Sequence, residues 1–256
     1  MKTVLAKGWS LAKLFVLFSI LFAFAAQAST IGEKRNALWR IVEICIANHE
    51  LTGASFPCLK VNMTDGIEHG YAILRPPFGK QDTILTPTIK IAGIEDPSLQ
   101  AADAPNYFED AWNARGFLSD GADKPLARDD VGLVVNSRLS RTQDQLHIHL
   151  GCLSAEAKRT LQTIAPQLSE THWLPLKRPI RGLAFWGRRL DQDTLVGINP
   201  FRIVADDIRG NVSMGPLTIV VAGYLPAEGR GGFIILVAQS GPDNAGEEVL
   251  DFSCSS

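Results

Sequence analysis

The sequence predicts an α+β protein, because segments with the spacing of amphipathic helices are interspersed with short strand-like segments. Apolar residues recur at helical intervals in 36–48 and in 106–118. Apolar and polar residues alternate strictly in 143–152, which is typical of a half-buried strand. A chain of 256 residues that is 46% hydrophobic and 20% charged also has the composition of a globular protein with a sizeable core.

The first 28 residues predict an export signal. Lysines up to Lys13 precede an uncharged apolar run at 14–26, and Ala26 and Ala28 have the spacing of a signal peptidase site. A membrane-spanning helix needs about 20 apolar residues, so both a cleaved signal peptide and an uncleaved signal anchor stay open. In either case we expect the lysines in the cytoplasm and the rest of the chain outside it.

The remaining elements follow from local patterns in chain order. The helix at 36–48 should face the core through Leu38, Ile41, Ile44 and Cys45. Further helices are expected at 106–118, capped by Asn106, and at 154–168. Strands are expected at 70–75, 83–85, 131–135, 143–152, 216–225 and 232–240.

Four cysteines in a chain that is predicted to be exported suggest disulfides. They are Cys45, Cys58, Cys152 and Cys254, and they allow three pairings. Cys45 with Cys58 is the local candidate, which would leave Cys152 to pair with Cys254. No close Cys-x-x-Cys pair is present, so a zinc site is the less favoured interpretation.

The strand expected at 143–152 carries the candidate functional residues. Its apolar side chains fall on one face, and the other face carries Gln143, Gln145, His147, His149 and Gly151. Two neutral imidazoles on one face can point into one cleft as a nucleophile and its partner, or as metal ligands. Two ordinary surface histidines are the simpler alternative. A catalytic zinc usually has three protein ligands, and the other three histidines show no patterned relation to this pair.

The run at 134–150 resembles the signature of the histidine-triad superfamily. In that signature a strand ending in asparagine, here Asn136, is followed by a turn, a glutamine and alternating histidines. The resemblance implies that His149 is the nucleophile and His147 its neighbour in the triad. It also implies that Asn136 and Gln143 hold phosphate oxygens, and the third histidine position falls on Gly151.

Two further side chains are candidates for substrate contact. Arg141 stands in the turn where the superfamily often has glycine, and an arginine there can bind phosphate through two hydrogen bonds. Gln145 shares the face of the two histidines. We expect no metal ligand set among the site residues.

A longer stretch, from 38 to 176, is similar to one branch of that superfamily, the CDP-diacylglycerol pyrophosphatases. The similarity runs through the segments LWRIV, LTPTIKIAGIEDPSL, NYFEDAWNAR and HWLPL. That branch also lacks the third histidine. The resemblance implies an α+β, HIT-like fold with a mainly antiparallel sheet and flanking helices, which we expect on one side of the sheet.

The residue patterns and the resemblance together predict the domain organisation, and the resemblance implies the reaction. A signal segment at 1–28 would precede a HIT-like catalytic domain at 31–176, and a C-terminal extension at 177–256 would carry a strand pair packed on the same domain. The implied reaction is hydrolysis of CDP-diacylglycerol to CMP and phosphatidate through a nucleotidyl-histidine, without a cofactor. The alternatives are an exported hydrolase acting on a soluble nucleotide pyrophosphate, and a non-catalytic nucleotide- or metal-binding module.

The expected partners are the lipid nucleotide and a membrane surface, and no obligate protein partner is evident. A net charge of -2 gives no reason to expect nucleic-acid binding. The basic stretch at 177–189 is ordinary solvated surface or a contact for anionic lipid, with Trp173 and Trp186 at the interface. We expect the protein at the bacterial inner membrane with its catalytic domain in the periplasm, or free in the periplasm after cleavage.

Overall fold

The computed structural model describes residues 32–75, 82–119, 126–207, 213–226 and 229–254. The signal segment expected at 1–28 lies outside these ranges. Within them, no helix combines the length and the apolar character that crossing a bilayer requires.

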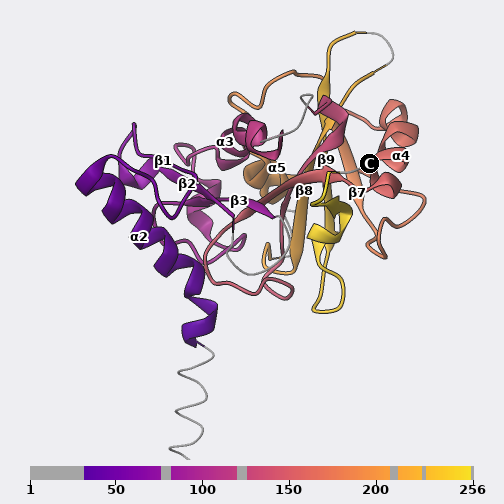
Figure 1. The fold of residues 1–256 in the computed structure, drawn as a ribbon. Coiled ribbons are helices and arrows are strands. Elements are labelled where there is room, and N and C mark those ends of the chain that lie inside the picture. Colours follow the sequence, from indigo (N-terminus) through magenta and orange to yellow (C-terminus); the bar gives the residue numbers. More distant parts are fainter. Residues whose placement is uncertain (1–31, 76–81, 120–125, 208–212, 227–228, 255–256) are drawn as a thin grey trace, which may run out of the picture.

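One large antiparallel sheet forms the centre of the molecule (Figure 1). The strands lie in the order β1-β2-β3-β5-β4-β8-β9-β7-β6, and β10 pairs with the end of β5. The expected α+β fold with a mainly antiparallel sheet is therefore confirmed. The strands are β1 (Lys60–Asn62), β2 (Tyr71–Leu74), β3 (Thr83–Pro87), β4 (Val131–Val135), β5 (Ile148–Leu153), β6 (Leu174–Pro175), β7 (Trp186–Leu190), β8 (Leu217–Tyr224), β9 (Gly232–Gln239) and β10 (Leu250–Asp251).

Local sequence sets where the helices begin and end. They are α2 (Ala37–Thr52), α3 (Tyr107–Asn113), α4 (Ala155–Ile164) and α5 (Pro200–Asp207). Asn106 and Ser154 cap α3 and α4, because their side chains accept hydrogen bonds from backbone N–H groups of the first turn. α2 ends at Gly53, whose φ of 75° lies in the left-handed region that glycine adopts without strain.

Helices cover both faces of the sheet, whereas the sequence led us to expect them on one side. On one face, α3 and α5 pack on the central strands through Phe108, Trp112 and Phe201. On the other face, α4 packs over β4, β8 and β9, and α2 packs over β1, β2 and β3. The reason is that β2, β8 and β9 are apolar at successive positions, so both of their faces need cover.

Several boundaries differ from the sequence-based expectation. β5 begins at Ile148, five residues later than expected, and α3 gives way to a 3-10 helix (Ala114–Ser119). In α2 the expected core residue Ile44 is 57% exposed, while Val42 and Cys45 are buried. The short elements α5 and β7 were not expected, since each has too few residues for a clear period.

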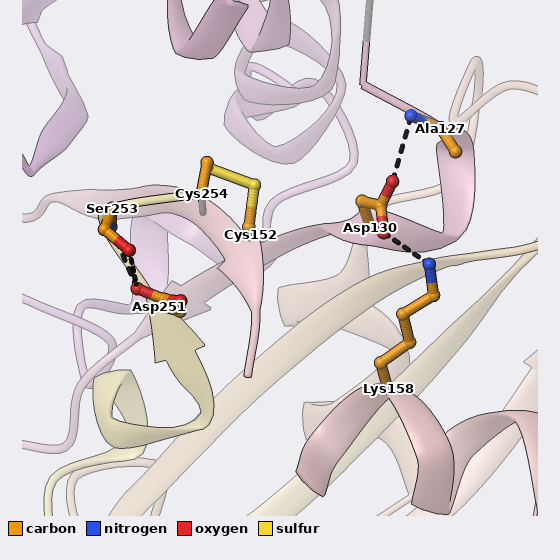
Figure 2. Close-up of a disulfide and its surroundings, with 7 residues drawn as sticks. All are labelled: Ala127, Asp130, Cys152, Lys158, Asp251, Ser253 and Cys254. Atoms are coloured by element: carbon orange, nitrogen blue, oxygen red, sulfur yellow. Dashed lines mark hydrogen bonds and ion pairs between the residues drawn. A yellow bond between two sulfur atoms is a disulfide. The ribbon is translucent and has the colours of Figure 1, made fainter. Parts of the chain in front are cut away.

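The C-terminal residues complete the same sheet. β8 pairs with β4 and β9 pairs with β8, so the expected strand pair extends the sheet directly instead of forming an appendage. Two disulfides, Cys45–Cys58 and Cys152–Cys254, are present. Figure 2 shows that the second joins the C-terminal end of β5 to the last described residue.

Candidate active site

The candidate site is a cavity of about 400 Å³ on the sheet face that carries α2 and α4. It lies where the apolar cluster under α2 gives way to the cluster under α4. One wall is apolar and comes from α2 and the strands beneath it; the opposite end is polar. The lining residues are Ala37, Leu38, Ile41, Leu74, Asp82, Ile84, Asn136, Ser140, Thr142, Gln143, His147, His149 and Glu247.

The two histidines lie side by side at the polar end. His149 is in β5, opposite Ile84 of β3 and Val134 of β4. His147 precedes β5, and its ring centroid lies 4.8 Å from that of His149 in an edge-to-face arrangement. Both rings are largely shielded from solvent, with residue exposures of 8% and 5% for His147 and His149, yet both line the cavity.

Two carboxylates hold His149. Its Nδ1 lies 2.8 Å from Oδ2 of Asp82, and its Nε2 lies 2.8 Å from Oε2 of Glu247. Burial lowers the pKa of His149, but Asp82 and Glu247 outweigh burial and raise that pKa to about 10. Without bound substrate His149 is therefore an imidazolium that donates both of its N–H groups.

His147 is neutral for the opposite reason. Burial, and after it the positive charge of His149, lower its pKa to about 4. Its Nδ1–H donates to the backbone carbonyl of Gln145 at 2.7 Å. This hydrogen bond fixes the tautomer, so Nε2 of His147 carries a lone pair.

Asn136 and Glu247 hold each other across the cavity. The Asn136 side-chain Nδ2 donates to Oε2 of Glu247 at 2.8 Å, and the backbone N–H of Glu247 donates to Oδ1 of Asn136 at 3.2 Å. Burial alone would raise the pKa of Glu247, but hydrogen bonds and charge from His149 hold it at about 2. The Glu247 carboxylate therefore occupies the amide of Asn136, which the resemblance implies holds a phosphate oxygen.

The sequence-predicted residues divide into two groups. The cavity brings together His147, His149, Asn136 and Gln143. The amide of Gln143 is also structural: its Oε1 accepts from the Leu38 N–H at 2.9 Å, and its Nε2 donates to the Lys34 carbonyl at 3.1 Å. Gln143 thus fastens the first turn of α2 to the rim of the cavity.

Arg141 and Gln145, expected to contact substrate, do not line the cavity. The Arg141 guanidinium is buried against the carboxylates of Glu95 and Asp144, at 2.6 and 3.1 Å. The Gln145 amide is fully buried and donates to Thr86 and to backbone carbonyls after β3. Both side chains instead stabilise the chain segment that leads into β5.

Gly151, at the third triad position, has little room for a side chain. A Cβ there would lie 3.2 Å from the Phe252 ring and 3.3 Å from Leu250. Leu250 belongs to β10, which pairs with the end of β5. The C-terminal segment thus covers the place where the superfamily signature has its third histidine.

The sequence did not predict Asp82 and Glu247 as site residues. Asp82 lies just before a short strand, and Glu247 lies in a 3-10 helix (Gly246–Val249) in the C-terminal part, where no resemblance guided us. The antiparallel pairing of β3 and β10 with β5 brings both beside His149. Neither position carries a local pattern that would have identified it.

The antiparallel α+β fold carries a cavity with two histidines and a side-chain amide gathered at its polar end. Comparison with known proteins gives the family. The sequence model of the CDP-diacylglycerol pyrophosphatase family (CDH) matches residues 33–256. The chain belongs to the CDP-diacylglycerol pyrophosphatase family, and the resemblance seen in the sequence is confirmed.

Individual relatives agree with this assignment. A CDP-diacylglycerol pyrophosphatase from Yersinia pestis is 34% identical over 248 residues, which cover 93% of each chain. A probable CDP-diacylglycerol pyrophosphatase from Mycobacterium leprae is 32% identical over 86% of this chain and 81% of its own. Among solved structures, a DUF4931 family protein from Bacillus cereus aligns with 72% of this chain and 85% of its own, with a TM-score of 0.46 and 12% identity.

Proposed function

We propose that this protein hydrolyses CDP-diacylglycerol to CMP and phosphatidate, with His149 as the nucleophile. The observation that carries the proposal is the cavity in which His149 and its neutral neighbour His147 lie beside the amide of Asn136. Relatives named CDP-diacylglycerol pyrophosphatases support the substrate class. The apolar wall made by Leu38, Ile41 and Ile84 suits an amphipathic substrate.

The proposed reaction has two displacements at one phosphorus atom. Nε2 of neutral His149 attacks the CMP phosphorus; a P–N bond forms, the bridging P–O bond breaks, and its electron pair leaves with phosphatidate. Water then attacks the nucleotidyl-histidine, and the electron pair of the P–N bond returns to Nε2 as CMP is released. Phosphatidate leaves as a stable anion, so its departure needs little help from an acid.

The surrounding side chains suit the charges of that reaction. The Nδ2 of Asn136 is a preorganised donor for a non-bridging phosphate oxygen. Asp82, hydrogen-bonded to Nδ1, orients the His149 ring and stabilises the positive charge that develops on it. His147 packs against His149 and fixes where that ring lies.

Two single substitutions test the assignment of the nucleophile. We expect His149→Ala to lower kcat by at least about a thousandfold, because it removes the attacking nitrogen. His147→Ala should lower kcat about 10- to 100-fold, since it only loosens the position of His149. The measurement is CMP release from micellar CDP-diacylglycerol, together with acid-labile labelling of the protein by CMP-labelled substrate.

The exposed His172 supplies a matched control, and His172→Ala should keep wild-type activity. The reverse order of effects would transfer the nucleophile to His147. Faster turnover of a water-soluble CDP-alcohol would select the soluble-substrate alternative, and an absence of both turnover and label would select a non-catalytic module. We expect full activity after dialysis against EDTA.

We propose further that the cavity works at the periplasmic side of the inner membrane. The first turns of α2, which begins at Ala37, line the cavity. A retained anchor would hold the cavity close to the bilayer. Protease digestion of spheroplasts tests this proposal, since a periplasmic domain is degraded and a cytoplasmic one is protected.

A further inference from the structure

The C-terminal segment, residues 246–254, delivers a carboxylate into the cavity. Its Leu250 and Phe252 cover Gly151, and its Glu247 reaches Nε2 of His149. The pairing of β10 with β5 holds the middle of the segment, and the Cys152–Cys254 disulfide holds its last residue (Figure 2). The segment therefore removes the space for a third histidine and supplies Glu247 to the same cavity.

The Glu247 carboxylate lies in the direction along which Nε2 of His149 must bond to phosphorus. A hydrogen bond to Nε2 lies along the ring lone pair, which is also the direction in which Nε2 must bond to phosphorus. The Glu247 Oε2, 2.8 Å from Nε2, thus lies where the phosphorus will be. When phosphorus takes that place, the carboxylate is displaced outward along the same line.

In-line displacement requires the attacking water to approach phosphorus from the side to which the Glu247 carboxylate has been displaced. The attacking and leaving atoms lie on opposite sides of a phosphorus atom that is being transferred. Water that displaces Nε2 must therefore approach from the side away from His149, where the displaced carboxylate would lie. The Glu247 side chain is 34% exposed, so this side is open to solvent.

We propose that Glu247 is the general base that deprotonates the water attacking the nucleotidyl-histidine. The inference rests on the proposed function, since it assigns a residue to the second half of that reaction. It gives the C-terminal segment a catalytic role that the histidine-triad residues do not cover.

The proton balance closes over one turnover. When the substrate phosphate displaces Glu247, the Nε2 proton of His149 passes to solvent, which leaves Nε2 with the lone pair that attacks phosphorus. Phosphatidate then leaves as an anion. Next Glu247 takes a proton from water as the water oxygen bonds to phosphorus and the P–N electron pair returns to Nε2. Finally the proton on Glu247 passes to Nε2, which restores the starting ion pair, so that one turnover releases one proton to solvent.

The other titratable side chains around His149 are less suited to this role. Asp82 bonds Nδ1, on the opposite edge of the ring from the phosphorus. His147 has a lone pair on Nε2, but its ring packs edge to face beside the His149 ring. Among the described residues that line the cavity, the remaining carboxylate is Glu247.

Glu247→Gln tests the proposal because it keeps the size and hydrogen-bonding capacity of the side chain but removes its basicity. The matched control is Glu248→Gln, the exposed neighbour in the same 3-10 helix. Rapid-quench measurements follow phosphatidate and CMP separately. We expect Glu247→Gln to release one equivalent of phosphatidate in a burst, to retain CMP on the protein, and to release CMP at least about 100-fold more slowly.

A second variant separates chemistry from folding. Glu247→Ala should regain CMP release when formate is added, because a small carboxylate can enter the vacated space. Glu248→Gln should behave like wild type and show no response to formate. A merely structural role for Glu247 predicts no burst and no rescue.

The outcomes distinguish this inference from the function on which it rests. If the wild-type protein does not hydrolyse CDP-diacylglycerol, the proposed function fails. If the wild-type protein is active and Glu247→Gln releases both products together, at any rate, Glu247 is not the base of the second step. A faster Glu247→Gln enzyme would mean that the carboxylate only obstructs the phosphate position.

Discussion

At the residue scale, His147 and His149 differ in charge because of what each ring contacts. His147 has a backbone carbonyl and a buried environment, and the pKa of its ring falls to about 4. His149 has a carboxylate on each nitrogen, and the pKa of its ring rises to about 10. Near neutral pH the free enzyme thus pairs one neutral ring with one charged ring. A substrate anion that replaces Glu247 would become the new charge partner of His149.

The raised pKa of His149 predicts a loss of stability in alkaline solution. The folded-state pKa of about 10 lies above the unfolded value of about 6.5. The ion pairs of His149 therefore stabilise the protein fully below about pH 6.5, and this contribution is lost as pH rises towards 10. The denaturation midpoint of the wild type should fall between pH 7 and 9.5 more steeply than that of His149→Gln.

Urea unfolding at several pH values measures this difference, and comparing the two proteins cancels the titration of lysines and tyrosines. Parallel curves for wild type and variant would mean that the carboxylates do not hold the charge on His149.

The site residues that the sequence revealed are those with a local spacing pattern. His147 and His149 share one face of an alternating segment, and Asn136 lies in the same short run that resembles the histidine-triad signature. Asp82 is 67 residues from His149, and Glu247 is 111 residues from Asn136. Only strand pairing and the C-terminal disulfide bring those carboxylates in, and one sequence contains no period that records such pairing.

At the element scale, the alternation of apolar and polar residues correctly predicted which side chains share a face of β5, but it placed the start of the strand too early. The segment 143–147 keeps the alternation of a strand, yet Gln143 bonds the start of α2 and Gln145 bonds the chain after β3. Those side-chain hydrogen bonds replace ladder pairing, so the regular strand begins at Ile148. A polar side chain that binds a distant backbone group cannot be told from a solvent-facing one by periodicity.

Gly151 gives a prediction at the scale of strand packing. Gly151→His would restore the superfamily triad, but its Cβ would lie 3.2 Å from Phe252 and 3.3 Å from Leu250. We expect β10 to be displaced, the stability to fall by about 1–3 kcal/mol or more, and the activity to fall because Glu247 moves with the segment. The measurements are the thermal midpoint and kcat.

Gly151→Ala is the control, since a methyl group needs only a few tenths of an ångström of adjustment and should have the smaller effect. A Gly151→His protein as stable and active as wild type would show that the C-terminal segment yields easily and does not hold Glu247 in place.

At the scale of the whole molecule, residues 177–256 are inseparable from the rest of the fold. β8 and β9 continue the sheet from β4, and the apolar clusters on both faces draw on strands from both halves of the chain. The family model likewise matches as far as residue 256. A truncation before β8 would expose the full length of β4 and remove Glu247, so the site depends on the complete sheet.

Loss of either disulfide should lower the stability, but only loss of the second should also lower kcat. Cys45–Cys58 closes 13 residues around the far end of α2, and Cys152–Cys254 closes 102 residues and fixes the segment that carries Glu247. In the chain-entropy account, loss of the longer link costs about 5 kcal/mol and loss of the shorter about 3 kcal/mol. Cys152→Ser with Cys254→Ser should also lower kcat at a temperature where the protein stays folded, because Glu247 is no longer held on the path of attack.

The paired substitutions Cys45→Ser and Cys58→Ser are the matched comparison. They should lower the midpoint of unfolding while leaving kcat within about twofold, because the bridge they remove lies outside the lining of the cavity. Circular dichroism and CMP release at one temperature, measured for both double variants, separate the two effects. Equal kcat values for the two variants would mean that the sheet alone positions the C-terminal segment, and that the second disulfide contributes only to stability.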